Sequence, residues 1–328
     1  MQFLTEYGLF LIETITIVIA IIAILVSIVA MVGKGKQLAK EHLEVTKLND
    51  KYQQTREQLQ EQLLTKKEFK LVQKNYKKQL KTQANTDRKR IFVIDFHGDL
   101  KASGGNNLRQ EVTAILSIAT PKDEVVARLE SPGGVVHGYG LAASQLQRFK
   151  DHKIPLTVAV DKVAASGGYM MACVADKIIA APFAIIGSIG VLLQMPNFNK
   201  WLKKHNIDFE QVTSGEYKRT LTMFGENTDK DRKKMQADLN DTHELFKEFV
   251  TTHRPQVDMD KVGTGEYWFA TRAKNLNLVD ELQTSDQYLV NASQSNDIYL
   301  IKQIVKKSWG KKLAHSAQQG FSKLTSVI

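Results

Sequence analysis

A long apolar run opens the chain and is followed by a strongly polar stretch. From Thr14 to Gly33 there are twenty consecutive residues without a charge, mostly Ile, Val and Ala. A helix of that length crosses the hydrocarbon core of a bilayer. The segment MQFLTEYG holds no Lys or Arg, and the apolar run is longer than that of a signal peptide. The pattern predicts a retained transmembrane helix over 8–33, with a cleaved signal peptide or a buried core helix as alternatives.

Residues 34–90 are rich in Lys, Gln, Glu and Leu and contain no proline, which favours helix. Leu38, Val45, Tyr52 and Leu59 recur every seven residues before a lysine interrupts the series. We expect a charged helical stalk or linker here. It is either a short coiled coil or a solvated segment near anionic lipid headgroups.

Residues 91–290 alternate short apolar runs with amphipathic stretches. Runs that are apolar throughout predict buried strands, and the stretches between them predict helices. The expected strands are 91–96, 124–130, 156–161, 176–182 and 184–193, and the expected helices are 107–119, 138–152 and 167–175. This order predicts an α/β domain with a parallel sheet and right-handed crossovers. Ligands bind such sheets at the carboxyl ends of the strands, where the glycines of this chain gather.

The net charge of +10 lies in the flanks of this domain. Residues 34–90 carry 16 basic and 7 acidic side chains, and the basic tail over 291–328 carries 6 and 1. Residues 91–290 carry 23 basic and 25 acidic side chains. A nucleic-acid groove reader carries its positive charge on the folded domain, so we expect no nucleic-acid partner. By the positive-inside rule, the lysines that follow the apolar run favour the cytoplasmic side for residues 91–290. The side of the membrane is nevertheless left undecided.

The sequence gives no sign of a metal or disulfide site. Cys173 is the one cysteine, the eight histidines are scattered, and no zinc-hydrolase His-Glu pattern is present. Cys173 is read as a small core residue. We therefore expect no metal and no cofactor.

Two glycine-rich junctions follow expected strands. In ESPGGVV, residues 130–136, Pro132 stiffens a turn and the glycines allow positive φ and a close backbone approach to an anion. In VAASGGYMMA, residues 163–172, Ser166 stands where a strand feeds a helix, near the positive end of the helix dipole. A helix cap would explain the serine but not two glycines that cost about 1 kcal/mol each. We expect the space beside them to hold a substrate carbonyl, with the N–H groups of Gly134 and Gly167 stabilising an oxyanion.

A serine nucleophile needs a base, and the residues leave two candidates. His137 with Asp161 could imitate a triad. Lys218, in SGEYKR, could serve if burial or a neighbouring positive charge lowers its pKa towards neutrality.

The motifs RLESPGG, VAASGGYMMA, GSIGV and SGEYKR, in this order and at these spacings, resemble the signal peptide peptidase A family of serine peptidases, peptidase family S49. With the apolar segment and charged stalk, the chain looks most like the SohB-type inner-membrane members. The resemblance implies a ClpP/crotonase-like fold and a Ser-Lys dyad. Ser166 then matches the nucleophile, Lys218 the general base, Ser188 the serine that orients the lysine, and Gly134 the oxyanion donor. His137 and Asp161 lose the triad role.

The resemblance also implies a single-pass protein of the bacterial inner membrane that cleaves polypeptides from membrane-derived or misfolded proteins. It implies a homo-oligomer, a ring in which serine and lysine meet across a subunit boundary. Two other classes stay open. A crotonase-like acyl-CoA enzyme shares the fold but would use acidic groups, and a noncatalytic membrane scaffold would use the stalk and ring to bind other proteins.

Overall fold

The computed structural model describes residues 8, 10–22, 24, 41–83 and 88–305. They belong to two units, one of residues 1–44 with 303–328 and one of residues 45–302. In the first unit, residues 10–22 are helical, with exposed isoleucines and valines. Among the described residues, no helix is both long and apolar enough to cross a membrane. Much of the expected transmembrane segment, residues 25–33, lies outside the described residues.

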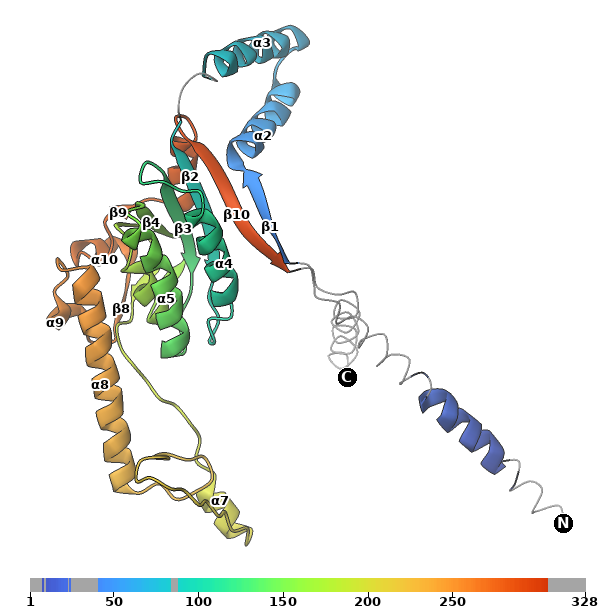
Figure 1. Ribbon diagram of the computed structural model, residues 1–328, viewed down its shortest axis with the longest axis vertical. Helices are drawn as coiled ribbons and strands as arrows, with labels where there is room; N and C mark the ends of the chain where they lie inside the picture. The colour runs from blue at the N-terminus through green and yellow to red at the C-terminus, as the bar shows by residue number, and fades with distance from the viewer. Residues whose placement is uncertain (1–7, 9, 23, 25–40, 84–87, 306–328) are drawn as a thin grey trace. The chain divides into compact units, whose positions relative to one another are not determined.

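The described strands and helices alternate through most of the second unit (Figure 1). The strands are β1 (Glu41–Lys47), β2 (Arg90–His97), β3 (Glu124–Glu130), β4 (Leu156–Val160), β5 (Val163–Ala165), β6 (Lys177–Ala180), β7 (Ile185–Gly187), β8 (Tyr267–Phe269), β9 (Glu281–Leu282) and β10 (Asp297–Val305). The helices are α2 (Leu48–Leu63), α3 (Lys66–Gln83), α4 (Gly105–Leu116), α5 (Val136–Asp151), α6 (Gly167–Ala172), α7 (Asn199–Lys204), α8 (Asp229–His253), α9 (Met259–Val262), α10 (Ala270–Asn275) and α11 (Ser285–Ala292).

The described strands form two sheets. The larger has the order β1-β10-β2-β3-β4-β6-β9, and every pair from β10 to β9 is parallel. The smaller has the order β5-β7-β8, with β5 and β7 parallel. The expected α/β class with a parallel sheet is confirmed, and the two-sheet arrangement fits a ClpP-like fold.

Hydrophobic side chains fill both faces of the larger sheet, because its strands are apolar on both sides. Phe92, Ile94 and Phe96 of β2 join the larger cluster, which also contains residues of α4, α5 and α6. Ile91 and Val93 point the other way, into a smaller cluster with residues of α2 and α11. The larger sheet is therefore packed on both faces, which holds the ends of its strands and the loops that follow them in place.

Two strands lie in segments where we expected no strand. Residues 41–47, within the expected helical stalk, form β1, and only α2 and α3 meet the expectation of helix. Residues 297–305, within the expected basic tail, form β10, which pairs with β2. Ile298 is fully buried by this pairing. The partner strand is some two hundred residues away, so local composition does not reveal it.

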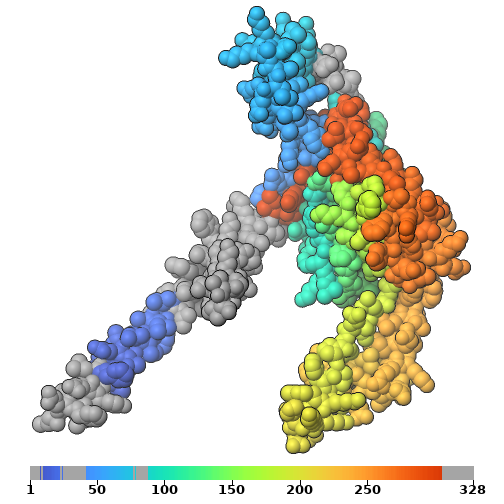
Figure 2. All heavy atoms as spheres, turned by 180° about the vertical axis from the view of Figure 1, so that it is seen from behind, coloured from blue at the N-terminus to red at the C-terminus, as the bar shows by residue number. Residues whose placement is uncertain are grey.

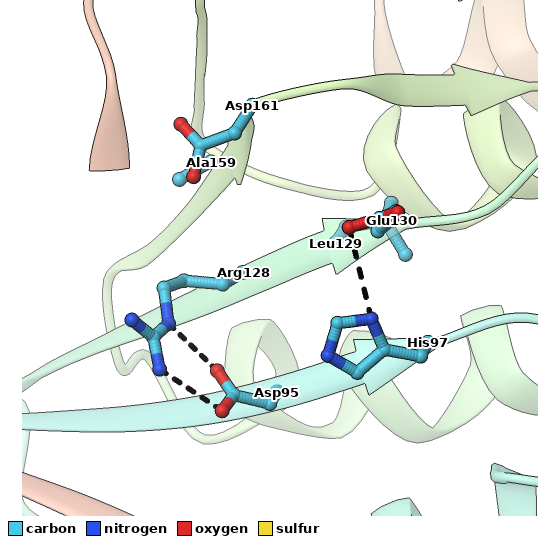
Figure 3. Close-up of a pocket in the computed structure, with 7 residues that line it drawn as sticks. All are labelled: Asp95, His97, Arg128, Leu129, Glu130, Ala159 and Asp161. Atoms are coloured by element: carbon cyan, nitrogen blue, oxygen red, sulfur yellow. Dashed lines mark hydrogen bonds and ion pairs between the residues drawn. The ribbon is translucent and has the colours of Figure 1, made fainter. Parts of the chain in front are cut away.

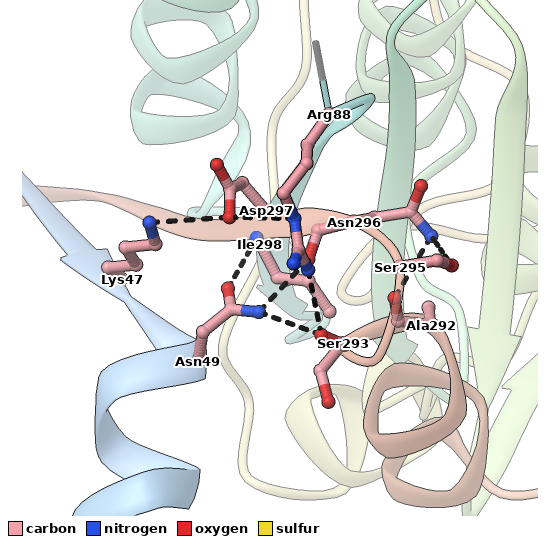
Figure 4. A network of polar contacts seen from close by, with 9 residues as sticks. All are labelled: Lys47, Asn49, Arg88, Ala292, Ser293, Ser295, Asn296, Asp297 and Ile298. Atoms are coloured by element: carbon pink, nitrogen blue, oxygen red, sulfur yellow. Dashed lines mark hydrogen bonds and ion pairs between the residues drawn. The ribbon is translucent and has the colours of Figure 1, made fainter. Parts of the chain in front are cut away.

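A polar network joins the start of α2 to the turn before β10 (Figure 4). The Asn49 side-chain amide donates to the carbonyls of Ser293 and Asn296, and its oxygen accepts from the Ile298 N–H at 2.7 Å. The Arg88 guanidinium donates to the same two carbonyls. These bonds satisfy the carbonyl of Ser293, the C-cap of α11, and that of Asn296 in the turn that follows.

Candidate active site

Ser166 stands between β5 and α6 with a strained backbone. Its φ of 52° and ψ of −120° are uncommon for a residue with a side chain. Its N–H donates to the Gly187 carbonyl at 2.8 Å, and its own carbonyl accepts from the Met170 N–H. Although Ser166 is the N-cap of α6, its side chain makes no capping hydrogen bond and is partly exposed. The hydroxyl is therefore free of the structural role that serine most often has at this position.

The two glycines after Ser166 are explained by packing. A β-carbon on Gly167 would lie 2.4 Å from Cγ of Tyr139, and one on Gly168 would lie 2.4 Å from the Ser131 carbonyl oxygen. The missing side chains therefore face protein atoms. Our expectation that this space holds a substrate carbonyl was wrong, because α5 and the turn after β3 already fill it.

The turn over residues 131–134 packs against the Ser166 backbone. Ser131 pairs with Ala164 of β5, donating its N–H to the Val163 carbonyl and accepting from the Ala165 N–H. Gly133 has φ +92°, which favours glycine. The Gly133 N–H donates to Ser131 Oγ at 3.1 Å.

The next N–H along this turn is available to a ligand. Within the described part of the chain, the N–H groups of Gly134 and Gly167 donate no hydrogen bond. Both residues line the same cavity as Ser166. Two residues with unbonded backbone N–H groups and one serine hydroxyl therefore line a common space, and acyl-transfer chemistry uses donors and a nucleophile placed together in this way.

Ser188 reaches this cavity from the neighbouring strand. Ala165 and Gly187 are partners in the β5–β7 ladder, so Ser166 and Ser188 are the next residues of two adjacent parallel strands. Ser188 also has a positive φ of 54°, and its N–H donates to the Glu266 carbonyl at 2.7 Å. The order of motifs in the sequence could not show this adjacency.

The cavity has a volume of about 860 Å³. Besides the glycine-rich turns, one face of α8 lines it, through Gln236, Leu239, Asn240, His243 and Phe246. The imidazole Nε2 of His243 lies 3.1 Å from the Ile189 carbonyl oxygen. Sequence reasoning missed this wall. These α8 residues are spaced three or four apart, which places them on one face of a helix, and that spacing was a signal in the sequence for a cavity wall.

Lys218 lies elsewhere in the single chain. It belongs to residues 191–228, which we call the arm, and Figure 2 shows the arm projecting beside the first half of α8. Tyr217 contacts α8 near its start, beneath the ammonium groups of Lys230 and Lys234. The cavity is lined by α8 only from Gln236 onward, and Lys218 is exposed and not part of the lining. The structure thus brings together Ser166, Gly134, Gly167 and Ser188, without Lys218.

The arm exposes large apolar side chains. Phe198, Trp201, Leu202 and Phe224 line a cavity of about 360 Å³ whose walls are almost entirely apolar, and Val212 is 97% exposed. Isolated exposed apolar residues are ordinary, but a group of this kind marks a surface that contacts another molecule.

The other candidates from the sequence lie outside the cavity. His137 is an exposed residue of α5, and Asp161 follows β4, where its carboxylate accepts from the Ser285 N–H and hydroxyl at 2.8 and 2.5 Å. Cys173 is fully buried, and burial raises the pKa of its thiol. Among the described residues, no three side chains of His, Cys, Asp or Glu are grouped as a metal site.

A second, smaller pocket of about 240 Å³ lies on β2, β3 and β4 (Figure 3). Four of its charged or titratable side chains pair with one another, and Asp161 is held by Ser285. Arg128 donates two hydrogen bonds to Asp95, at 2.7 and 2.9 Å, and His97 lies 3.8 Å from Glu130. Asp161, the triad candidate, lines this pocket, but Ser166, Lys218 and His137 do not.

Known proteins resemble this chain over most of its length. Residues 2–146 match the Peptidase family S49 N-terminal family, and residues 148–298 match Peptidase family S49. The chain is 46% identical to a probable protease SohB of Haemophilus influenzae, over 96% of this chain and 93% of that one. It is 46% identical to a probable protease SohB of Buchnera aphidicola subsp. Schlechtendalia chinensis, over 89% of this chain and 100% of the relative. A probable protease SohB of Buchnera aphidicola subsp. Acyrthosiphon pisum is 57% identical, over 67% and 66% of the two chains. With its two halves matched in order and its relatives aligned over most of their length, the chain belongs to peptidase family S49.

Proposed function

We propose that this chain is a membrane-anchored serine endopeptidase in which Ser166 is the nucleophile and Lys218 the general base. One observation carries the proposal. A partly exposed serine hydroxyl without a capping bond shares a cavity with two backbone N–H groups that donate no hydrogen bond, those of Gly134 and Gly167. That geometry suits a reaction in which negative charge develops on a carbonyl oxygen.

In the proposed reaction, the neutral Lys218 amine takes the proton of Ser166 as Oγ attacks the carbonyl carbon of a peptide bond. The carbonyl oxygen becomes an oxyanion held by the N–H groups of Gly134 and Gly167. The tetrahedral intermediate then collapses, the C–N bond breaks, and Lys218 returns the proton to the leaving amine. Water repeats these steps on the ester and frees Ser166. The Ser188 hydroxyl would orient the lysine amine.

The lysine would come from a neighbouring subunit. In the single chain Lys218 is exposed on the arm and lies apart from the cavity. The same arm carries the apolar cavity formed by Phe198, Trp201, Leu202 and Phe224. Docking of this surface on a second copy would bury the apolar side chains and bring an amine into a drier place, which lowers a lysine pKa. The chain would then be inactive until it assembles.

The proposed substrates are polypeptides in extended form, with small or apolar side chains next to the cleaved bond. The cavity offers Met170, Leu192, Leu239 and Phe246 to such side chains. The apolar run over residues 14–33 would anchor the enzyme in the bacterial inner membrane. Membrane-derived and misfolded proteins would then be the polypeptides within reach.

The test uses purified full-length protein and a fluorogenic peptide. Ser166→Ala and Lys218→Ala should each lower kcat by a thousandfold or more, roughly the effect of losing a nucleophile or its base. Co-expression of the two variants should restore about a quarter of the activity, since one site in four would combine an intact serine with an intact lysine if subunits mix at random. Activity in either variant alone near that of the wild type would reject the dyad. Mixed oligomers without activity would reject a site shared between subunits.

A further inference from the structure

A buried chain of hydrogen bonds through Ser131 and Tyr139, which we call the relay, supports the turn that carries the Gly134 N–H. Ser131 and Tyr139 are both fully buried. Their oxygens lie 2.6 Å apart, and the Tyr139 hydroxyl donates to the Asp99 carbonyl at 2.8 Å. Each hydroxyl has one proton. Because Tyr139 gives its proton to Asp99, Ser131 must donate to Tyr139, which leaves Ser131 Oγ as the acceptor for the Gly133 N–H at 3.1 Å.

The direction of these bonds is fixed, from Gly133 through Ser131 and Tyr139 to the Asp99 carbonyl. Burial raises the pKa of Tyr139, although its hydrogen bond with Ser131 acts to lower it, so the phenol keeps its proton. The space around the relay is closed. A β-carbon on Gly98 would lie 2.2 Å from Ser131 Oγ and 2.3 Å from the Tyr139 oxygen. The Gly98 backbone therefore packs directly against both hydroxyl groups.

The relay determines which N–H of the turn is left without a hydrogen bond. Gly133 and Gly134 offer consecutive N–H groups, and the relay takes the first of them. The second, on Gly134, stays without an acceptor among the described residues. The same tyrosine also backs the other donor, because a β-carbon on Gly167 would lie 2.4 Å from its Cγ.

We propose that Tyr139 is a positioning residue that holds both oxyanion donors, the Gly134 N–H through Ser131 and the Gly167 N–H through its ring. The inference rests on the peptidase function proposed above. Tyr139 touches no substrate, so its effect must appear in the transition state. Removal of the phenol oxygen leaves the Ser131 proton without an acceptor, and the turn rearranges to satisfy it.

Tyr169 provides a matched control. It is also fully buried, and its hydroxyl donates to a backbone carbonyl, that of Leu278, at 3.1 Å. Tyr169→Phe therefore removes a buried hydrogen bond of the same kind, away from the turn. A purely structural role for Tyr139 predicts the same kinetic result for the two phenylalanine variants.

The experiment compares full-length wild type, Tyr139→Phe, Tyr169→Phe and Ser131→Ala. Steady-state kinetics would be measured with a fluorogenic peptide, inhibition with a peptide aldehyde, and thermal unfolding by circular dichroism. The aldehyde carbon is attacked by the serine hydroxyl, which gives a hemiacetal whose oxygen occupies the oxyanion position. Removal of a whole oxyanion donor costs about 10²–10³ in kcat. Tyr139→Phe displaces a donor without removing it, so we expect kcat to fall by about 10–100-fold. KM should stay within about twofold of the wild-type value.

Aldehyde affinity should fall by a factor similar to that in kcat. Ser131→Ala should behave in the same way and serves if Tyr139→Phe does not fold. Tyr169→Phe should keep kcat within about twofold at a comparable loss of Tm. If Tyr139→Phe and Tyr169→Phe had the same kcat and the same affinity for the aldehyde, the proposed positioning role of Tyr139 would be wrong. A wild type without peptidase activity, or hydrolysis that survives in Ser166→Ala, would instead defeat the peptidase function itself.

Discussion

A β-carbon placed on Gly133 would lie 2.7 Å from the β-carbon of Ser166, so the turn after β3 and the turn before α6 touch at the proposed nucleophile. Gly133→Ala adds this clash to the strain of an alanine at φ +92°. We expect a loss of about 2–4 kcal/mol in unfolding free energy. Peptidase activity should also fall by more than the folded fraction explains. Chemical denaturation and activity per folded molecule measure the two effects.

Gly140→Ala is the control for that substitution. Gly140 lies inside α5, and a β-carbon there has nothing within 4 Å. The variant should be as stable as the wild type or more stable by up to about 1 kcal/mol, because alanine favours helix. Destabilisation of both variants to the same degree would contradict the contact argument.

The α8 wall of the cavity depends on a buried ion pair at its end. Arg254, which is 2% exposed, donates to both carboxylate oxygens of Asp280 and to the Asn277 carbonyl. Asp280→Asn should destabilise the fold by about 3 kcal/mol, since it leaves a buried guanidinium without its counter-charge. Asp258→Asn, in the exposed pair with Lys261, should leave the urea midpoint close to that of the wild type, because solvent screens the pair. Equal urea midpoints for the two variants would contradict this difference.

Asp123 gives the fold a stability that depends on pH. Burial acts to raise the pKa of Asp123, but hydrogen bonds from Arg90 and Thr120 outweigh it and lower this pKa to about 2. A carboxyl whose pKa is lower in the folded chain adds stability above its unfolded value of about 3.9 and loses it as the pH falls through the folded value. The shift corresponds to about 2.5 kcal/mol at neutral pH. The excess stability of wild type over Asp123→Asn should therefore disappear between pH 4 and 2.

A constant difference between wild type and Asp123→Asn from pH 7 to pH 2 would show that the carboxylate charge is not the cause. The measurement is urea denaturation at each pH. Direct titration of the carboxyl by carbon NMR gives an independent value for its pKa.

The start of α2 should loosen when Asn49 is changed. Its side chain makes three hydrogen bonds to the turn around residues 293–298. Asn49→Ala should cost about 1–3 kcal/mol and speed hydrogen exchange at the Ile298 amide, which loses its acceptor. Asn75→Ala, at an exposed position of α3, is the control and should leave that amide protected. If hydrogen exchange at the Ile298 amide were unchanged in Asn49→Ala, the polar network would not be what holds the start of α2 to this turn.

Assembly should respond to the exposed apolar side chains of the arm. Val212 is 97% exposed, so Val212→Asp should leave the fold of the single chain intact. It should lower oligomer mass and peptidase activity together, because the proposed lysine arrives with the arm. Ile118→Asp, at a position 57% exposed outside the arm, should leave both unchanged. A fully active oligomer of Val212→Asp would argue against this surface.

Local patterns predicted the elements whose contacts are close in the sequence. The strand expected over 124–130 is β3 with the same bounds, and the helices over 107–119 and 138–152 correspond to α4 and α5. In these segments, alternation of apolar and polar residues is set by the face each element buries. The pairing of β10 with β2 joins positions about two hundred residues apart, and neither strand alone indicates its partner.

The sequence motifs predicted which residues form the site better than our reasoning predicted how they are arranged. Ser166, Gly134, Gly167 and Ser188 do share one cavity, but the reason for the glycine pair was wrong, and the α8 wall was missed. Lys218 illustrates a further limit. Its proposed place in the site requires a second copy, which the folding of one chain does not reveal, and its role stays a prediction.

The bridge from Ser131 to Ala164 links the end of β3, in the seven-stranded sheet, to a three-stranded sheet whose strands are only three residues each. Such short strands open at lower cost than the long parallel ones. On heating, the three-stranded sheet that leads into Ser166 should therefore open while the seven-stranded sheet is still intact. The temperature at which hydrolysis stops would then mark an early, partial melting, several degrees before circular dichroism records any loss of helix.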